Sequence, residues 1–341
     1  GGLTPEQYQD KEAAKELDPT RMSYQDGGGD LGGLGEINCQ HYSWGRGIGF
    51  PSKAYDYPIS EPVQPRSRQP RDLLYIWDGE KPLVFGEVFY AVGNMGRMAW
   101  MGGPDIYEGQ DAWDRACARY ARVCIEGARW QDVTGICPWT VLPEAGKSFA
   151  PKAVFVREHN SCFQSGGTLR RNIGVFLEGR EPDTLTLNWK LVLGGNAVAE
   201  GEKSYQMQPG RHEDDVLEAS LPETNRRLDG ELKLVLTDGS GEQVFEDSKP
   251  VAVLPDPAPV NTDPGLVGVH DPEGSTVAWL DKVGQDYTRV NDLARLPRNI
   301  KVLLIGRNAL PEVTYKGRPR RAQYSREREA IDDSLVDFVK E

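Results

Sequence analysis

In the first region of the chain, residues 1–148, stretches with helical spacing of apolar residues alternate with strand-like stretches. The clearest helix is predicted over 111–130, where the apolar positions are 112, 113, 116, 117, 120, 123, 124 and 128. Strands are predicted over 37–42, 83–89 and 133–141. Because the strands are apolar and alternate with helices, they indicate a parallel sheet, either in a barrel or in a doubly wound fold.

A two-residue alternation of apolar and polar positions replaces that pattern in the second region, residues 149–254. The alternation is clearest over 172–177, 185–193 and 231–236, and glycine-rich turn signals separate these stretches. About seven short strands in about 100 residues are typical of an antiparallel β-sandwich of the immunoglobulin type.

A linker is predicted over 255–265, which contains four prolines in eleven residues. A new α/β pattern follows it, with a strand over 266–269, a helix over 275–283, a buried parallel strand over 302–306 and a helix over 325–340. The pattern then stops, so residues 266–341 are predicted to form an incomplete α/β domain. The chain is therefore predicted to be a multidomain protein with α/β and all-β parts.

The net charge of −12 disfavours nucleic acid and anionic membranes as partners, because both reward clustered Lys and Arg. No apolar run reaches the roughly 18 residues that a membrane span needs. The chain starts without Met and stops inside a predicted helix, so we expect both ends to be cuts through a longer protein. The compartment is therefore left open, with a periplasmic or secreted bacterial protein favoured over a cytoplasmic one.

Cysteine and histidine spacing gives no support for a metal site or any other cofactor. The five cysteines, at 39, 117, 124, 137 and 162, form no CxxC pair and no zinc-like spacing with the four histidines. Cys117 and Cys124 share a face of the predicted helix but lie too far apart along it for a disulfide. We expect all five cysteines to be buried free thiols.

Glu87 is the candidate catalytic residue, because it places a carboxylate at the end of an otherwise apolar strand. An unpaired charge is costly to bury, and the carboxyl ends of barrel strands face the active site in (β/α)8 enzymes. Retaining glycosidases use one such carboxylate as nucleophile and a second as acid/base. Local chemistry leaves a structural role equally open, in which Glu87 pairs with an arginine or caps a helix.

Five short motifs in this order resemble the C-terminal half of the barrel of glycoside hydrolase family 2, which includes β-galactosidases, β-glucuronidases and β-mannosidases. The motifs are Leu17-Asp-Pro-Thr-Arg21, Tyr24-Gln-Asp-Gly27, Asn38-Cys-Gln-His-Tyr42, Pro82-Leu-Val-Phe-Gly-Glu87 and Gly135-Ile-Cys-Pro-Trp139. Their order and spacing fit barrel strands five to eight. The following region, 149–254, resembles the immunoglobulin-like domain that accompanies this barrel.

The resemblance implies a role for each of several residues. Glu87 would form the glycosyl-enzyme ester, and Tyr42 or the neighbouring His41 would approach the nucleophile or a sugar hydroxyl. Trp139 would form the floor of the sugar subsite, and the weaker candidates for the cleft wall are Trp44, Phe89 and Tyr90. Ordinary packing is the alternative for each of these aromatic residues.

The acid/base of the family is the Glu of an Asn-Glu pair at the end of strand four, and no Asn-Glu pair occurs in this chain. We expect it upstream of residue 1, which predicts that this fragment is inactive by itself. Glu36 is rejected as a substitute because it lies at the start of a predicted strand, which is the wrong end.

The third region resembles the opening of a glutamine-amidotransferase-like domain of flavodoxin-like fold, on the segments 268–274, 287–293 and 302–310. Such domains accompany some β-galactosidases without a catalytic Cys, and no Cys follows Cys162 here. The resemblance implies an assembly role, with this domain as a candidate surface for a homo-oligomer. Gly268 and Gly306 form no Gly-rich fingerprint for a nucleotide.

The favoured function is a retaining β-glycosidase acting on β-galactosides or a related oligosaccharide. The alternative is a non-catalytic carbohydrate-binding or assembly protein built on a decayed glycosidase barrel. A third hypothesis makes 266–341 a domain that binds a small ligand, against which the missing phosphate loop weighs.

Overall fold

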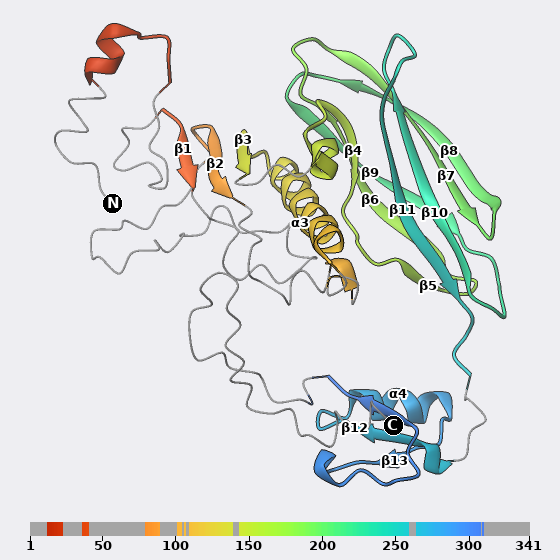
Figure 1. Ribbon diagram of the computed structural model, residues 1–341. Coiled ribbons are helices and arrows are strands. Elements are labelled where there is room, and N and C mark those ends of the chain that lie inside the picture. Colours follow the sequence, from red (N-terminus) through yellow and green to blue (C-terminus); the bar gives the residue numbers. More distant parts are fainter. Residues whose placement is uncertain are drawn as a thin grey trace. The chain divides into compact units, whose positions relative to one another are not determined.

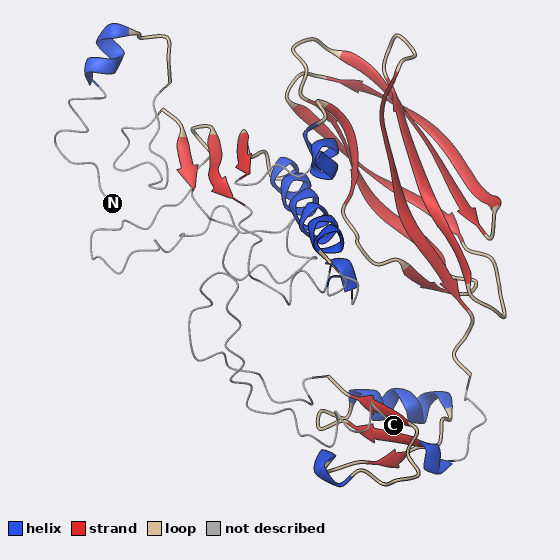
Figure 2. Ribbon diagram, viewed as in Figure 1, coloured by secondary structure: helices blue, strands red, loops and turns tan. Residues whose placement is uncertain are grey.

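The computed structural model describes residues 12–22, 36–40, 79–88, 101–103, 106, 109–138, 143–258, 264–307 and 309. They fall into two compact units, Gly1–Leu254 and Pro255–Glu341, and each is taken by itself below. The described part is mostly β structure with few helices (Figures 1 and 2). Among the described residues, no helix is long and apolar enough to cross a membrane.

A parallel sheet comes first along the chain. Its strands are β1 (Asn38–Gln40), β2 (Leu83–Val88) and β3 (Gly135–Pro138), hydrogen-bonded in that order. Both pairings are parallel, as the apolar strand pattern predicted. Closure of this sheet into a barrel stays a prediction, because it needs segments outside the described residues.

Helix α3 (Gln110–Trp130) connects β2 to β3 and confirms the predicted helix to within one residue. Its C-terminus is closed by Asp132, the one described non-glycine residue in the left-handed region, with φ of 59°. The backbone N–H groups of Asp132 and Val133 donate to the carbonyls of Arg129 and Ala128, which satisfies the last turn. The 3-10 helix η3 (Pro143–Phe149) follows β3 and packs on α3.

Two sheets form a sandwich in the same unit (Figure 2). One sheet has the order β4-β6-β9, with bounds Lys152–Val156, Thr168–Leu177 and Arg211–Ser220. The other has the order β5-β11-β10-β7-β8, with bounds Cys162–Gln164, Gln243–Leu254, Leu228–Thr237, Asp183–Leu193 and Asn196–Met207. All neighbours are antiparallel except the parallel pair of β5 and β11.

The sandwich core follows from the alternation that the sequence displays. On β10, Leu232, Leu234 and Leu236 are fully buried, and the residues between them are more exposed. The opposite sheet contributes Val154 and Leu169, also fully buried, to the same apolar cluster. The alternation therefore predicts the sandwich correctly, whereas its immunoglobulin type stays a prediction.

The second unit contains a small parallel sheet with the order β13-β12-β14. Its elements are η4 (Pro264–Leu266), β12 (Val267–His270), α4 (Ser275–Val283), β13 (Thr288–Arg289), η5 (Leu293–Arg295) and β14 (Val302–Ile305). One Asp271 carboxylate oxygen accepts from the backbone N–H groups of Thr276 and Val277, at 2.7 and 2.9 Å, and thereby caps α4. The predicted helix over 275–283 is confirmed, and the predicted helix over 325–340 lies outside the described residues.

Two burial predictions are wrong. The strand predicted as buried over 302–306 is parallel, but Val302 and Ile305 are 51% and 39% exposed because β14 is an edge strand in the described sheet. Cys137 and Cys162 are exposed free thiols, since the short strands that carry them leave one side open. The other three cysteines are buried, as predicted, and burial, with a contribution from Asp114, raises the pKa of Cys117 to about 11.

Gly230 marks a close approach of two strands inside the sandwich. A Cβ built at this position would collide with the backbone carbonyl of Val192 on β7, which cannot move without breaking the pairing of β10 with β7. We predict that Gly230→Ala lowers the free energy of unfolding by about 2 kcal/mol or more. Gly146→Ala is the matched control, because a Cβ there meets no atom within 4 Å. Equal stability of the two variants in urea unfolding would contradict the close approach.

Candidate active site

The carboxyl ends of β1, β2 and β3 lie at one edge of the parallel sheet. The register pairs Gln40, the last residue of β1, with Phe85, and Phe85 with Ile136, so the three strands are level close to their carboxyl ends. In Figure 1 the arrowheads of these strands point the same way. Residues that follow the strands therefore leave the sheet at a common edge, which is where α/β enzymes place their active sites.

Strand β2 carries a β-bulge just before Glu87. Phe85 pairs with Ile136 and Glu87 pairs with Cys137, so Gly86 has no opposite residue. Before the bulge, Leu83 and Phe85 are fully buried in the cluster that contains α3. One extra residue shifts the two-residue alternation, so position 87 is out of phase with Leu83 and Phe85. Bulges of this kind are common beside active sites.

The structure describes part of the predicted site. The backbone of Glu87 lies in β2, next to the end of the strand, with Cys137 of β3 as its neighbour. The other predicted site residues, which lie outside the described residues, are His41, Tyr42, Trp44, Phe89, Tyr90 and Trp139. In the chain, His41 follows the last residue of β1 and Trp139 the last residue of β3.

Behind the sheet, one face of α3 holds β2 in place. Leu83 and Phe85 share a buried cluster with Ala116, Tyr120 and Cys124 of the helix. All five side chains are at most 3% exposed. The strand that carries Glu87 is therefore fixed by apolar packing on its helix side.

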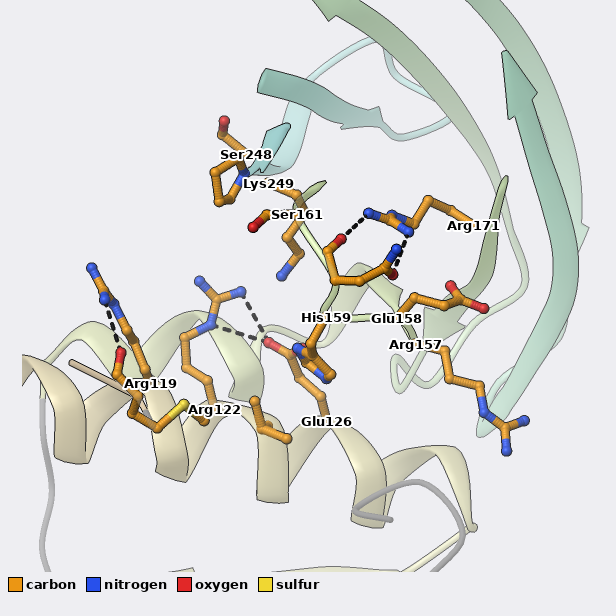
Figure 3. Close-up of a pocket in the computed structure, with 14 residues that line it drawn as sticks. Arg119, Arg122, Glu126, Arg157, Glu158, His159, Ser161, Arg171, Ser248 and Lys249 are labelled. Atoms are coloured by element: carbon orange, nitrogen blue, oxygen red, sulfur yellow. Dashed lines mark hydrogen bonds and ion pairs between the residues drawn. The ribbon is translucent and has the colours of Figure 1, made fainter. Parts of the chain in front are cut away.

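A second face of α3 is charged and packs against the sandwich. The Arg122 guanidinium donates to Glu126, one turn further along the helix, at 2.9 Å (Figure 3). The same group donates to Asp247 of β11 at 2.8 Å. Asp247 also pairs with Lys249 at 2.9 Å, and the side chains of Glu126 and Asp247 are only 1% and 5% exposed. These contacts form a buried network of alternating charge, the Arg122 network.

Arg129 extends the contact near the end of the helix. Its guanidinium donates to Glu178 at 2.7 Å and to the carbonyl of Ser148 at 2.6 Å. It also lies over the rings of Phe155 and Phe176, at 4.9 and 5.2 Å from their centroids. Burial lowers the pKa of Arg129, and the Glu178 carboxylate opposes that shift, so the group stays charged.

Within the Arg122 network, the pKa values of Asp247 and Arg122 are shifted in the direction that favours their ion pair. Burial alone would raise the pKa of Asp247, but Lys249 and Arg122 outweigh burial and hold it at about 2. Burial alone would lower the pKa of Arg122, but Glu126 and Asp247 raise it above its ordinary value. Both groups are therefore ionised near pH 7.

The sequence contained a signal for this network that hydrophobic periodicity missed. Arg122, Glu126 and Arg129 are spaced i, i+4 and i+7 on the helix, so they share one face. A charged stripe of this kind is usually solvated. Here the sandwich covers it, which the sequence of the helix alone does not indicate.

Comparison with known proteins assigns no family. No family model matches the chain, and no curated protein matches it. Among solved structures, the Amycolatopsis orientalis exo-chitosanase CsxA in complex with PNP-β-D-glucosamine is similar at a TM-score of 0.31 and 15% identity, over 46% of this chain and 21% of the exo-chitosanase. The chain thus spans about a fifth of that enzyme's length.

Two further glycoside hydrolases are similar at lower scores. A putative β-galactosidase from Bacteroides fragilis has a TM-score of 0.22 and 12% identity, over 36% of this chain and 20% of that chain. A β-glucosidase from Listeria innocua has a TM-score of 0.23 and 11% identity, over 30% of this chain and 16% of that chain.

The similar structures are not restricted to sugar-cleaving enzymes. The Pseudomonas fluorescens alkylpurine DNA glycosylase AlkC has a TM-score of 0.23 and 11% identity, over 46% of this chain and 42% of that chain. With every reported TM-score below 0.5, these likenesses assign no activity to the chain.

Asp247 is predicted to contribute more to the free energy of unfolding than a carboxylate in an exposed ion pair does. Asp247→Asn removes the charge on which Arg122 and Lys249 converge, and we expect it to lower the free energy of unfolding by on the order of 2 kcal/mol. The control is Asp229→Asn, which breaks a pair with Arg227 in which both side chains are more than 60% exposed and which should cost less than about 1 kcal/mol. Chemical unfolding of the two variants measures the difference, and equal losses would contradict a buried network.

The same carboxylate predicts an acid dependence of stability. Its pKa is about 2 in the folded chain, against an ordinary value of 3.8. The folded state therefore binds fewer protons between these values, so the contribution is complete above about pH 4 and is lost as the pH falls through about 2. We expect the stability difference between wild type and Asp247→Asn to shrink over that window in urea titrations at a series of pH values. A constant difference from pH 5 to pH 2 would contradict the assignment.

Proposed function

We propose that this chain is part of a retaining glycoside hydrolase, resembling family 2, with Glu87 as its nucleophile. The observation that carries the proposal is the register of the parallel sheet. Position 87 lies next to the carboxyl end of the middle strand, beside β1 and β3. In the sequence, the candidates His41 and Tyr42 directly follow β1, and the candidate Trp139 directly follows β3.

The proposed domain organisation follows the same regions as the sequence. Residues 1–148 would be the C-terminal half of the catalytic barrel, and 149–254 the immunoglobulin-like sandwich. After the linker 255–265, residues 266–341 would begin the glutamine-amidotransferase-like domain. A β-glycoside or oligosaccharide would be the substrate, with no cofactor.

In the proposed reaction, the ionised Glu87 carboxylate attacks the anomeric carbon as the bond to the leaving oxygen breaks. An acid delivers a proton to that oxygen, and a covalent glycosyl ester of Glu87 remains. Water then attacks the anomeric carbon, releases the carboxylate and restores the original anomeric configuration. The acid/base is not assigned to a residue of this chain.

Tyr42 or His41 would hold the attacking carboxylate or a sugar hydroxyl by a hydrogen bond. Trp139 would stack on the apolar face of the sugar, with Trp44 and Tyr90 as candidates for the cleft wall. Each of these roles rests on the family resemblance and on the position of the residue after a strand of the sheet.

A fluorosugar with a dinitrophenyl leaving group tests the nucleophile directly. Such a leaving group departs without protonation, so ester formation does not depend on the acid/base. We expect a 2-deoxy-2-fluoro-β-galactoside of this kind to add one sugar mass to the peptide that contains Glu87, as measured by peptide mass spectrometry. Glu87→Gln should abolish the label, while Glu80→Gln, an exposed position just before β2, should keep it.

Labelling at another residue would overturn the assignment of Glu87. Sugar binding without any label in the wild-type chain would favour the non-catalytic carbohydrate-binding alternative. Where hydrolysis is measured, product analysis by NMR should give retention of the anomeric configuration, and clean inversion would contradict the mechanism.

A further inference from the structure

A pocket of about 890 Å³ lies between α3 and the sandwich in the first unit (Figure 3). This volume is in the range of small-molecule binding sites. Its walls come from α3, from the segment 157–161 between β4 and β5, and from strands β6 and β11. Because these elements belong to two different layers of the unit, the pocket is built by tertiary packing and not by one loop.

The lining of the pocket is positively charged, although the chain as a whole is acidic. Among the described residues, five cationic side chains and the two carboxylates of Glu126 and Glu158 line it. The cations are Arg119, Arg122, Arg157, Arg171 and Lys249. Asp247 of the Arg122 network adds a third carboxylate behind the wall, which still leaves an excess of positive charge in a chain of net charge −12.

Arg171 is a buried cation of this lining that has no ion pair among the described residues. The residue is only 2% exposed, and its guanidinium donates to the side chain of Asn160 at 3.0 Å and to the Asn160 carbonyl. Within the described residues it has no ion pair, and its Nε has no hydrogen-bond partner. Burial lowers the pKa of Arg171, and Glu158 opposes that shift through space, while the Phe163 ring lies 4.8 Å from the guanidinium. Burying a charge that has no ion pair is costly, so an anion in the adjoining pocket would stabilise Arg171 further.

Arg119 is a second cation without an ion pair in the described part of the chain. It lies at the exposed rim of the pocket on α3 and donates to the carbonyl of Met101 at 3.0 Å. Lys249, on the opposite wall, is 20% exposed and reaches toward α3 (Figure 3). A ligand entering past Arg119 would thus meet cationic groups on both sides.

The imidazole of His159 also lines the pocket, and its pKa is lowered. Burial is the main cause that lowers its pKa to about 4, and the positive charges of Lys249 and Arg171 lower it further, against Glu126 and Glu158. The imidazole is therefore neutral near pH 7 and adds no positive charge to the lining. The hydroxyl of Ser161 on the same lining provides an additional neutral donor, whereas that of Ser248 donates to Glu231.

We propose that this pocket binds the oxyanion group of a small acidic ligand, such as a sulfate ester or a carboxylate. An oxyanion offers several acceptor oxygens to charged donors and supplies the negative charge that the lining lacks. A neutral ligand would leave the excess positive charge uncompensated. No residue of β1, β2 or β3 is among the described residues of the lining, and the inference does not depend on the role of Glu87.

Calorimetric titration of the whole chain in a low-chloride buffer tests the class of ligand. The probes are inorganic sulfate, glucuronic acid, galactose 6-sulfate and galactose. Saturable binding of the three anions, and none of galactose, is expected. Tighter binding of the acidic sugars than of sulfate would identify a saccharide as the source of the oxyanion, whereas similar affinity would identify the free anion. The proposal would be overturned if galactose bound with the same affinity as galactose 6-sulfate. It would also be overturned if no anion showed saturable binding.

Single charge removals locate the binding. Arg119→Gln and Lys249→Gln should each weaken sulfate binding about tenfold, which corresponds to about 1.4 kcal/mol. Arg170→Gln and Lys190→Gln are the controls, because they remove one exposed positive charge each from the same unit, in ion pairs with Glu218 and Glu200 and away from the pocket. Equal weakening by the controls would mean that sulfate responds only to net charge, and would refute the site.

The wild-type chain provides a test that needs no variant to fold. An anion in the pocket should raise the pKa of His159, because it stabilises the imidazolium. NMR titration of the histidine rings, of which the chain has four, with and without sulfate measures this shift. A rise at His159 and none at His270, which belongs to the other unit, is the expected result, and an unchanged His159 would contradict binding at this place.

Discussion

Arg122 and Arg129 of α3 carry charges that are nearly removed from water, and such charges are tolerated only where counter-charges are built into the fold. For Arg122, one counter-charge lies on the helix itself and the other, Asp247, lies on the sandwich. For Arg129, the partner Glu178 and both stacked rings belong to the sandwich. Without the sandwich, α3 would expose an apolar surface, Arg122 would lose Asp247, and Arg129 would lose Glu178 and both rings.

That dependence extends to the parallel sheet, because α3 is packed on more than one side. Leu83 and Phe85 of β2 lie against the apolar face of the helix, while the charged face meets the sandwich. Trp130, at the end of the helix, packs against both apolar clusters and meets Phe176 edge to face at 5.9 Å. Strand β2, which carries the proposed nucleophile, therefore packs against α3, and the contacts of α3 with the sandwich fix the position of the helix.

Residues with a strong local pattern were predictable from the sequence. The helix of 111–130 and the alternation of 185–193 and 231–236 correspond to α3, β7 and β10, because burial of one face imposes the period of each element. Partners distant in the chain were not predictable: Asp247 lies 125 residues after Arg122. The bulge at Gly86 was not predictable either. It arises from the register of β2 against β3, which the sequence of one strand does not encode.

Glu87 is a charged residue on an otherwise apolar strand, and Arg171 is a charged residue that is buried in the sandwich. In both cases the cost of burying a charge points to a function. The sequence does not indicate which member of the Arg170-Arg171 pair is buried. The structure separates the two: Arg170 is exposed and paired with Glu218, whereas Arg171 is buried with no ion pair in the described residues. A carboxylate at a sheet edge suits attack on an electron-poor sugar carbon, and a buried guanidinium beside a cavity suits an oxyanion. The sign of each charge thus points to a different ligand group, and the two positions need not serve the same molecule.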